Sequence, residues 1–274
     1  MIVNGEKLAK KIILDIRKEI EKTNKSFGLG VVLVGKNPES LKYVEKKREK
    51  CLELGIEFFL FQSKKPDQQE ILMQIEEWNK NPRVTGIIVQ LPIPKYLDKE
   101  KIIGAIDFRK DVDGLTNENA GRLFKGLPGK ISATALAVIE ILESIKYDLS
   151  GKKVAVIGRS NLVSKPLSHL LLARDATVII CHSRTSDLGE ITRMADVVIS
   201  IAGKPGLIID KMIKSGAVVI DVGITKKGSK IVGDVDLEKV APIASYITPV
   251  PGGVGPLTVA MLMKNVVKGW KTRK

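Results

Sequence analysis

The chain has 274 residues, which is enough for two ordinary domains or one large one with a hydrophobic core. Apolar residues make up 44% and charged residues 28%, as in soluble globular proteins, while aromatic residues make up only 4%, so Ile, Val and Leu must build the core. The formal net charge of +14 favours anionic ligands, but the lysines are spread along the chain without interleaved aromatic residues and no apolar run is long enough for a bilayer, so we expect neither a nucleic-acid nor a membrane partner.

Charged and apolar residues alternate with helical spacing in the N-terminal segment, which lacks the apolar core of a signal peptide. Short β-branched runs then alternate with helical patterns, which predicts parallel sheets with helical crossovers. One helix is well delimited over Pro38–Leu54, because Asn37 can cap it and Gly55 suits the position just past its end. The predicted strands are Leu29–Val34, Ile56–Phe61, Thr85–Gln90, Val154–Ile157, Thr177–Cys181, Val197–Ile201 and Val218–Val222.

A domain boundary is expected in the turn-rich segment GLPGK, residues 126–130, and the last segment is helical again from about Gly255. Cysteine and histidine are rare, with two residues of each. These numbers exclude a disulfide framework and a four-ligand zinc site of the usual spacing, so no metal is expected. The same cysteine usage favours a reducing, cytoplasmic setting.

The first residues that point to a ligand follow the strand Val154–Ile157. Gly158 ends this strand, and a polar turn leads into an apolar helix near Leu167, with Ser164 able to cap it and Pro166 in its first turn. A strand, a tight glycine turn and a helix N-terminus together can hold a pyrophosphate. Only the first glycine of the GxGxxG fingerprint is present, so an ordinary strand–helix turn stays open as an alternative.

The next strand bears on which dinucleotide would bind. NAD sites place an acidic residue at the end of this strand to hold the ribose hydroxyls. Here Thr177–Cys181 continues into His182, Ser183 and Arg184, without an acid. Ser183 and Arg184 together with Arg159 suit a 2′-phosphate, which favours NADP over NAD, although an exposed basic turn would look the same.

The first half of the chain holds a second group of polar candidates. Tyr43 and Lys47 lie four residues apart on the predicted helix and therefore on one face, where a ring can stack on a planar substrate and an amine can handle a proton. Gln90 ends an apolar strand, which is where α/β folds place ligand contacts. Two ordinary explanations stay open: Tyr43 and Lys47 can be a surface pair, and Gln90 can simply end the strand.

Two acids flank a turn in the sequence Lys110-Asp111-Val112-Asp113-Gly114. A calcium loop with Gly114 at its sixth position is excluded, because Arg109 and Ala120 would then occupy the first and twelfth positions, where acids are needed. A single carboxylate here can pair with an amidine-like edge through two hydrogen bonds, or simply serve an Asp-Gly turn.

From Ser40 to Asn265 the chain resembles the bifunctional methylenetetrahydrofolate dehydrogenase/cyclohydrolase family. The ordered motifs that carry the resemblance are SLKYVEKKREKCLELGI, GIIVQLPIP, KDVDGLTNENAGRL, GKKVAVIGRSNLVSKP, CHSRTSDL, GAVVIDVGI, GDVD and TPVPGGVGPLTVAMLMKN. It implies an α/β fold of two domains: an N-terminal catalytic domain, residues 1–128, rejoined by a C-terminal helix, residues 255–274, and a Rossmann-like dinucleotide-binding domain, residues 129–254. It also implies NADP as cofactor, tetrahydrofolate derivatives as substrates, and a homodimer with its active site in the cleft between the domains.

The resemblance implies roles for the residues already named. Tyr43 is similar to a tyrosine that stacks on the folate, Lys47 to the catalytic lysine, Gln90 to a glutamine that bonds this lysine, and Asp113 to an aspartate that grips the pterin. The substrate site would also include Leu91, Pro251, Gly252 and Gly253. The cofactor site would comprise Gly158, Arg159, Ser160, Ser164, Lys165, Pro166, Ser183, Arg184, Thr134 and Ile224.

Two departures from the family pattern stand out. A Pro-Cys-Thr-Pro segment is replaced by Ser132-Ala133-Thr134-Ala135, and Ser164 replaces a glycine in the phosphate loop. The Ser164 side chain would either crowd the pyrophosphate or donate a hydrogen bond to it. Two other functions stay open at this point, a dehydrogenase without cyclohydrolase activity and a basic nucleic-acid or dinucleotide-sensing protein without turnover.

Overall fold

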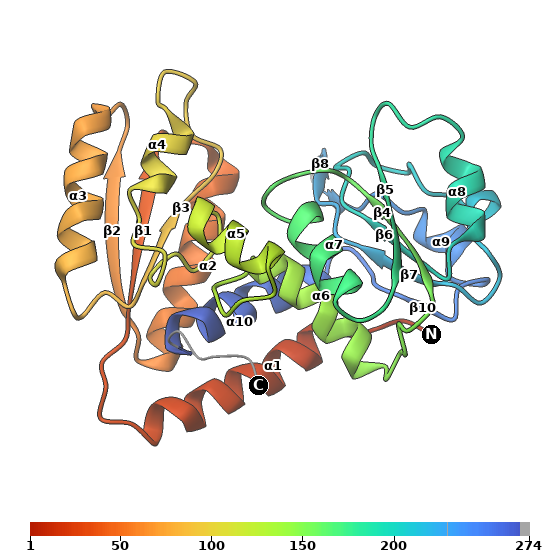
Figure 1. Ribbon diagram of the computed structural model, residues 1–274, viewed down its shortest axis with the longest axis horizontal. Helices are drawn as coiled ribbons and strands as arrows, with labels where there is room; N and C mark the ends of the chain where they lie inside the picture. The colour runs from red at the N-terminus through yellow and green to blue at the C-terminus, as the bar shows by residue number, and fades with distance from the viewer. Residues whose placement is uncertain (229, 269–274) are drawn as a thin grey trace. The chain divides into compact units, whose positions relative to one another are not determined.

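The chain folds into two compact units in a computed structural model, which describes residues 1–228 and 230–268 (Figure 1). The three-stranded unit comprises Lys11–Ala133 and the chain from Val259, and the five-stranded unit comprises Met1–Lys10 and Thr134–Thr258. The part of the expected C-terminal helix at 269–274 lies outside the described residues. The division falls within two helices, α1 (Gly5–Glu21) and α10 (Val254–Val267).

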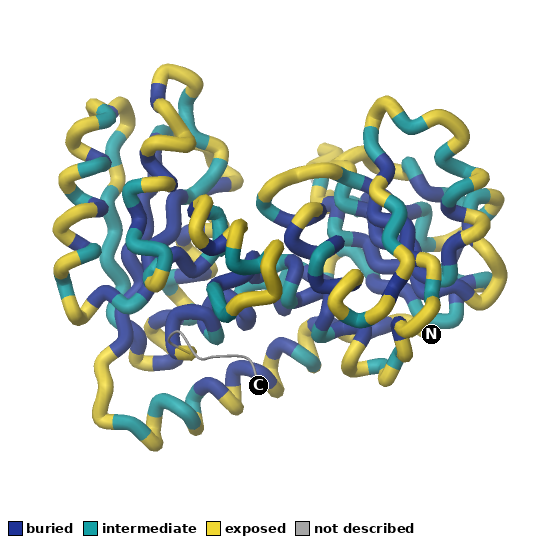
Figure 2. Tube along the Cα trace, viewed as in Figure 1, coloured by how far each residue is buried: buried dark blue, intermediate teal, exposed yellow. Residues whose placement is uncertain are grey.

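The three-stranded unit has a parallel sheet in the order β2-β1-β3. Its strand β1 is buried along its whole length, as the dark tube in Figure 2 shows, because helices cover both faces. Ile71, Ile75 and Ile102 pack on the face that carries Val32 and Val89. The elements are β1 (Gly28–Val34), α2 (Pro38–Leu54), β2 (Glu57–Ser63), α3 (Gln68–Lys80), β3 (Gly86–Val89), α4 (Lys99–Gly104) and α5 (Asn117–Phe124).

The second half of α10 belongs to the three-stranded unit. Met263 Sδ accepts a hydrogen bond from Cys51 Sγ on α2 at 3.7 Å, and Val266 C=O accepts from Thr85 Oγ1, just before β3, at 3.2 Å. The amide of Asn265 donates to the carbonyls of Val112 and Ile131, each at 2.8 Å. The C-terminal helix therefore returns to the first sheet, as the fold class predicted.

The five-stranded unit has an all-parallel sheet in the order β10-β7-β6-β4-β5. Counted in chain order its strands read 5-4-3-1-2, the doubly wound arrangement whose topological switch point lies between the first and third strands, here β4 and β6. Ligands of such sheets bind outside the carboxyl ends of the strands at this point. The elements are α6 (Ala133–Ser144), β4 (Lys153–Ile157), α7 (Ser164–Leu172), β5 (Thr177–Cys181), α8 (Leu188–Met194), β6 (Val197–Ser200), a 3-10 turn η1 (Asp210–Met212), β7 (Val218–Asp221), a hairpin of β8 (Thr225–Lys227) and β9 (Lys230–Val232), α9 (Leu237–Val240) and β10 (Tyr246–Ile247).

The N-terminal residues join the five-stranded unit although the sequence assigned residues 1–10 to the first domain. Ile2 forms a parallel bridge with Ile247, and the Val3 N–H donates to the Ile247 carbonyl at 2.8 Å. The pattern of these first residues gives no sign of a partner so distant in sequence.

The seven predicted strands are all present, with ends within two residues of those expected, and α2 spans the predicted residues. The short strands β8, β9 and β10 were not predicted. The expectation that Ser164 caps a helix beginning near Leu167 was wrong. Helix α7 begins at Ser164, and Ser160 Oγ accepts from the N–H groups of Val163 and Ser164 instead.

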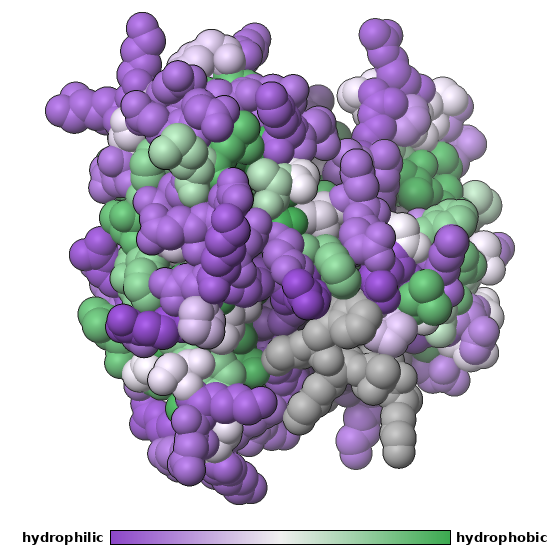
Figure 3. Space-filling view, turned by 60° about the vertical axis from the view of Figure 1, so that its left-hand side comes forward, coloured by the Kyte–Doolittle hydropathy of each residue, from purple (hydrophilic) through white to green (hydrophobic). Residues whose placement is uncertain are grey.

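Hydrophilic side chains cover most of the face seen in Figure 3, with small apolar areas between them. This surface agrees with a lysine-rich composition. Among the described residues, no helix combines the length and the apolar character that crossing a bilayer requires.

Candidate active site

Helix α2 places a lysine on its buried side. The buried positions follow the three-to-four-residue period of a helix face that packs on the sheet: Ser40, Val44, Lys47, Cys51 and Leu54. Lys47 is only 9% exposed, whereas Tyr43, one turn earlier, is 37% exposed. The predicted pair therefore divides into a buried amine and a ring that reaches solvent.

Lys47 donates a hydrogen bond from Nζ to Gln90 Oε1 at 2.5 Å. The glutamine is itself held in place, because its backbone N–H donates to the Val32 carbonyl and its Nε2 donates to the Leu91 carbonyl, each at 2.9 Å. Gln90 thus continues the β3 ladder by one residue and presents its side-chain oxygen to the amine. Burial lowers the pKa of Lys47, while the carboxylate of Asp113 opposes that shift.

Asp113 lies at the same edge of the sheet, because the segment before it pairs with β3 through a parallel bridge. The Ile87 N–H donates to the Lys110 carbonyl at 2.7 Å, and Ile87 forms a parallel bridge with Asp111, so Asp113 lies two residues further toward the carboxyl end of β3. Desolvation raises the pKa of Asp113 to about 6, with Lys47 lowering it and Asp111 raising it further. The electrostatic effect of each group on the pKa of the other indicates that Asp113 and Lys47 lie near each other at this edge of the sheet.

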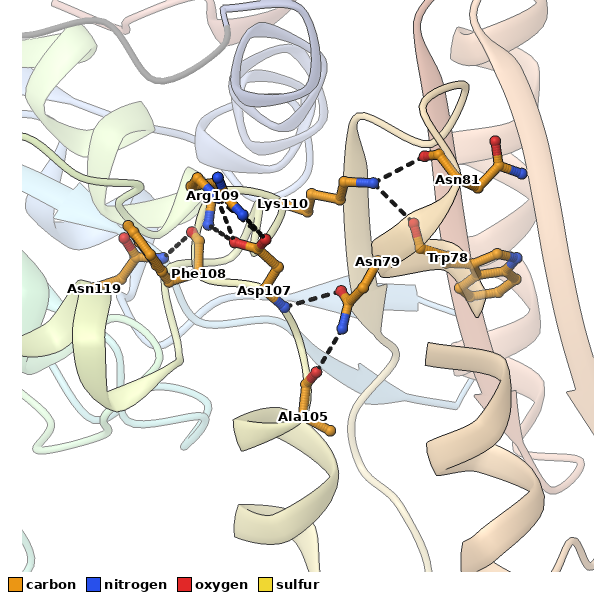
Figure 4. A network of polar contacts seen from close by, with 9 residues as sticks. All are labelled: Trp78, Asn79, Asn81, Ala105, Asp107, Phe108, Arg109, Lys110 and Asn119. Carbon is orange, nitrogen blue, oxygen red and sulfur yellow. Dashed lines mark hydrogen bonds and ion pairs between the residues drawn. The ribbon is translucent and has the colours of Figure 1, made fainter. Parts of the chain in front are cut away.

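The segment that precedes Asp113 is anchored to α3 (Figure 4). Lys110 donates from Nζ to the carbonyls of Trp78 and Asn81, each at 2.8 Å, which satisfies backbone groups at the end of that helix. The amide of Asn79 accepts from the Asp107 N–H at 2.9 Å and donates to the Ala105 carbonyl at 2.8 Å. These bonds restrain the backbone from which Asp113 projects.

The turn after β4 requires a glycine. Gly158 has a φ of +144°, and an added Cβ would lie 2.7 Å from Ser164 Oγ and 3.2 Å from the Ile201 carbonyl oxygen. Both the conformation and the space therefore exclude a side chain. This tight turn at the switch point is the form of backbone that approaches a dinucleotide pyrophosphate.

The phosphate loop is braced by its own serines. Ser164 is fully buried, and its hydroxyl lies 3.5 Å from Ser160 Oγ and beside Gly158. Its side chain therefore points into the turn, toward Gly158 and Ser160. Pro166 is buried as well, whereas Arg159, Ser160, Asn161 and Lys165 are exposed.

At the carboxyl end of β5, Ser183 and Arg184 are exposed. His182 Nδ1 accepts from the Arg184 N–H at 3.1 Å, and the His182 N–H donates to Thr185 Oγ1 at 2.8 Å, which shapes the turn. Within the described residues, the guanidinium groups of Arg159 and Arg184 form no ion pair with a carboxylate. Strand β5 pairs with β4, so Ser183 and Arg184 follow the strand next to the one that ends at the Gly158 turn.

The remaining predicted residues lie in the five-stranded unit. Thr134, in the first turn of α6, accepts from Thr258 Oγ1 at 3.5 Å, and Ile224 is 47% exposed just after β7. The loop of Pro251, Gly252 and Gly253 follows β10, and its Gly252 carbonyl accepts from the Gly5 N–H at 3.0 Å. An added Cβ on Gly5 would lie 1.8 Å from the Gly253 carbonyl oxygen, so these glycines permit a close approach within the chain itself.

Comparison with known proteins identifies the family to which this arrangement belongs. The sequence profile of the tetrahydrofolate dehydrogenase/cyclohydrolase catalytic domain matches residues 3–113, and that of the same family's NAD(P)-binding domain matches residues 132–274. The chain belongs to the tetrahydrofolate dehydrogenase/cyclohydrolase family. A relative named bifunctional protein FolD, from a Nitratiruptor species, is 49% identical and aligns over 100% of this chain and 99% of its own length.

Solved structures of the family share the fold. The bifunctional enzyme FolD from Campylobacter jejuni is 42% identical, with a TM-score of 0.95 over 98% of this chain and 97% of its own. The FolD of Trypanosoma brucei, whose structure was solved with NADP cofactor and an inhibitor, is 35% identical, with a TM-score of 0.93 over 97% of this chain and 95% of its own.

The family motif KDVDGLTNENAGRL also contains residues whose roles sequence reasoning missed. Asp111 is 1% exposed and accepts from the Thr116 N–H at 2.8 Å and from the Asn119 amide at 3.0 Å. Asn119 in turn accepts from the Lys130 N–H at 3.0 Å, and Lys130 donates from Nζ to the carbonyls of Asn265 and Lys268. Burial lowers the pKa of Lys130 to about 8. The first acid of the motif therefore organises the backbone, and the second interacts electrostatically with Lys47.

Proposed function

We propose that this chain oxidises 5,10-methylenetetrahydrofolate to 5,10-methenyltetrahydrofolate with NADP, and hydrolyses that product to 10-formyltetrahydrofolate in one-carbon metabolism. The observation that carries the proposal is the buried Lys47 ammonium, hydrogen-bonded to Gln90 and coupled to Asp113, in a member of this family. A dehydrogenase without the second activity needs no such amine.

The residues present fit NADP. Gly158 supplies the tight turn at the switch point, and Arg159, Ser160 and Lys165 offer exposed polar groups to a pyrophosphate. Ser183 and Arg184, without a neighbouring acid, suit the 2′-phosphate. We assign Thr134 and Ile224 to the same site, with Ser164 and Pro166 shaping its loop from within. NADP, when bound, accepts a hydride from the methylene carbon of the folate.

The three-stranded unit supplies Asp113 and Tyr43, to which we assign most of the binding and orientation of the folate. The Asp113 carboxylate accepts two parallel hydrogen bonds from the amino-pyrimidine edge of the pterin, and the partly exposed Tyr43 ring stacks on the planar substrate. Leu91 lies beside Gln90, and we place Pro251, Gly252 and Gly253 in a loop that borders the substrate. Hydride departure needs no protein acid or base, because the folate nitrogen lone pair stabilises the resulting cation, so these residues contribute orientation.

Hydrolysis needs a proton acceptor and a proton donor. Water attacks the methenyl carbon, a C–O bond forms, and one C–N bond of the five-membered ring breaks. We assign the proton transfer to Lys47 Nζ, which accepts one proton from the water and returns it to the departing ring nitrogen, while Gln90 holds the amine in place. The second water proton leaves to solvent as the formyl C=O forms, so the cation and water give the neutral product and one proton. Burial lowers the pKa of Lys47, and a cationic substrate beside the amine would lower it further, which favours the neutral form that accepts a proton.

The proposal extends to a homodimer in a reducing, cytoplasmic setting, with no nucleic-acid or membrane partner. The family resemblance supports the dimer, and the two buried free cysteines, Cys51 and Cys181, suit a reducing compartment. Light scattering after gel filtration tests the dimer by its mass. A monomer at micromolar concentration would remove this part of the proposal.

Two assays on the purified chain test the function. The first follows reduction of NADP and of NAD with methylenetetrahydrofolate, and the second follows formation of 10-formyltetrahydrofolate from the methenyl compound. Turnover in both, with NADP preferred, is the expected result. NADP reduction without formyl product would leave only a dehydrogenase, and the absence of both reactions would overturn the proposal.

A further inference from the structure

A buried carboxylate that the proposed chemistry does not use lies beneath the loop after β6. Asp234 is fully buried, and its two oxygens accept hydrogen bonds from Ser200 Oγ at 2.8 Å and from the N–H groups of Ala202, Gly203 and Lys204 at 2.7, 3.2 and 2.7 Å. Three consecutive N–H groups around one anion form a nest. The loop conformation therefore depends on this carboxylate, which has no ion-pair partner among the described residues.

The outer side of this loop is exposed at the switch point. Residues 202–204 are exposed, Gly203 has a φ of +64°, and the preceding Ser200 pairs in register with Ile157 of β4. The Ile201 carbonyl lies within 3.2 Å of the position that a Cβ on Gly158 would occupy. The loop thus lies directly beside the glycine turn of the proposed cofactor site.

A second carboxylate holds the first one in place. Asp221, at the end of β7, accepts from the N–H groups of Gly223, Asp234 and Val235 at 3.0, 3.0 and 2.9 Å. An added Cβ on Gly223 would lie 2.2 Å from Asp234 Cγ. The glycine that precedes Ile224 therefore packs directly on the Asp234 carboxylate, and this carboxylate connects the loops after β6 and β7.

The order of the strands indicates what these two loops would contact. The proposed 2′-phosphate residues follow β5 and the pyrophosphate turn follows β4, so the rest of a bound dinucleotide must continue along the edge over β6 and β7. That path leads the nicotinamide half to residues 202–204 and Ile224.

We propose that Asp234 is a positioning residue for the cofactor, holding the loops after β6 and β7 in the arrangement that receives the nicotinamide half of NADP. This inference rests on the proposed cofactor site. Asp234 does not touch the cofactor, and it acts through the backbone N–H groups that it orders. The carboxylate is suited to this role because only an anion with two oxygens accepts all four donors at once.

The test is Asp234→Asn in the full-length enzyme, with Asp236→Asn as the matched control. The amide replaces one acceptor oxygen by an NH₂ group, which then faces at least one backbone N–H. We expect the Kd for NADP and the KM for NADP to rise about tenfold or more, equivalent to about 1.4 kcal/mol. Cyclohydrolase kcat and KM, which need no NADP, stay within twofold. Asp236 caps α9 by accepting from the Lys239 N–H, and its variant keeps wild-type NADP affinity.

An NADP Kd within twofold of wild type in folded Asp234→Asn protein would overturn the inference. So would a parallel fall of NADP affinity and cyclohydrolase activity, which would mark a merely structural role. If this variant does not fold, Ser200→Ala replaces it, because it removes one hydrogen-bond donor to the Asp234 carboxylate. We then expect the Kd for NADP to rise two- to fivefold, and an unchanged Kd would contradict the inference. Failure of the wild-type enzyme to bind NADP would instead refute the proposed cofactor site.

Discussion

At the scale of single residues, burial makes two neighbouring lysines chemically different. Lys46 and Lys47 are adjacent in sequence, but only Lys47 lies on the buried face of α2, where desolvation lowers its pKa and Gln90 fixes its amine. An exposed lysine stays protonated near neutral pH and cannot accept a proton. The two acids of the DVDG turn also differ in their partners. Asp111 accepts hydrogen bonds from the Thr116 N–H and the Asn119 amide, whereas Asp113 is free to accept hydrogen bonds from a substrate.

Replacement of Lys47 by Met tests its role. We expect the Lys47→Met variant to lose cyclohydrolase activity while it retains part of its dehydrogenase activity, because only hydrolysis needs proton transfer by the protein. Parallel assays of formyl product and NADP reduction measure the two rates. Lys46→Met makes the same change one residue earlier on the exposed face and should keep both. Full cyclohydrolase turnover in Lys47→Met would remove this residue from the mechanism.

The ionisation of Asp113 predicts an acid limb in the pH profile. Its pKa is raised to about 6, and the carboxylate that receives the pterin edge is present above this pH. We expect kcat/KM for methylenetetrahydrofolate to fall as pH decreases through about 6, approaching tenfold per pH unit below it. An Asp113→Asn variant should have low kcat/KM and lack this limb. A wild-type profile that stays level down to pH 5 would contradict the assignment.

Charge at the end of β5 predicts cofactor choice. An acid at position 183 repels a 2′-phosphate but can accept hydrogen bonds from ribose hydroxyls, so Ser183→Asp should weaken NADP binding much more than NAD binding. Arg159→Ala should have the same preference, because it removes a cation from the 2′-phosphate. Fluorescence titration with both cofactors measures the ratio, and Ser26→Asp at an exposed position serves as a control. Equal losses for NADP and NAD would refute the assignment.

At the scale of elements, the sequence predicts the first residue of a helix correctly when the residue expected to cap it does accept hydrogen bonds from its first N–H groups. Asn37 accepts from the N–H groups of Glu39 and Ser40, and Gly55 closes α2 with a φ of +68°. The start of α7 was misplaced because Ser160, four residues before the helix, provides the bonds that were expected from Ser164. These bonds depend on the conformation of the loop between Ser160 and the helix, which the residue pattern does not encode.

The cap of α2 gives a stability prediction. Asn37→Ala leaves two N–H groups at the helix start without their side-chain acceptor and should lower the free energy of unfolding by about 1 kcal/mol. Denaturant titration measures the loss. Asn24→Ala, at an exposed position before β1, should change stability by less than half of this amount. Equal stability of Asn37→Ala and wild type would show that water replaces the cap without cost.

At the scale of the whole molecule, each unit has its own parallel sheet and its own core, and the polar residues of interest follow the carboxyl ends of strands. Gln90 follows β3, Gly158 follows β4, and Ser183 follows β5. In parallel α/β sheets this edge receives ligands because consecutive strands deliver their loops there.

The placement of the cofactor at this edge predicts a pattern of hydrogen exchange. Saturating NADP should slow amide exchange in residues 158–165 and 201–205, which follow β4 and β6, and leave residues 149–152, before β4, unchanged. Mass spectrometry of exchange with and without NADP resolves these segments. The Ser183→Asp variant at the same NADP concentration should show little protection. Protection confined to the opposite edge would place the cofactor elsewhere.

Much of this protein is determined by sequence alone. Strand positions follow from β-branched runs, α2 follows from its cap and its terminal glycine, and the glycine turn after β4 follows from chain order. Local backbone preference and burial periodicity suffice for these features, because the decisive residues lie within a few positions of one another. The family resemblance adds the roles we propose for Lys47, Gln90 and Asp113, because spacing alone does not distinguish a functional residue from an ordinary structural one.

The tertiary structure decided what depends on residues distant in sequence. It brings Lys47 within 2.5 Å of Gln90, and it joins the N-terminal residues to Ile247. It also buries Asp234 under the loop after β6. Burial and hydrogen-bond partners set each side chain's charge state and freedom, and both arise only when separate elements pack together. Lys46 and Lys47 are the same residue type, as are Asp111 and Asp113. Only the packing around each side chain makes the members of a pair chemically different.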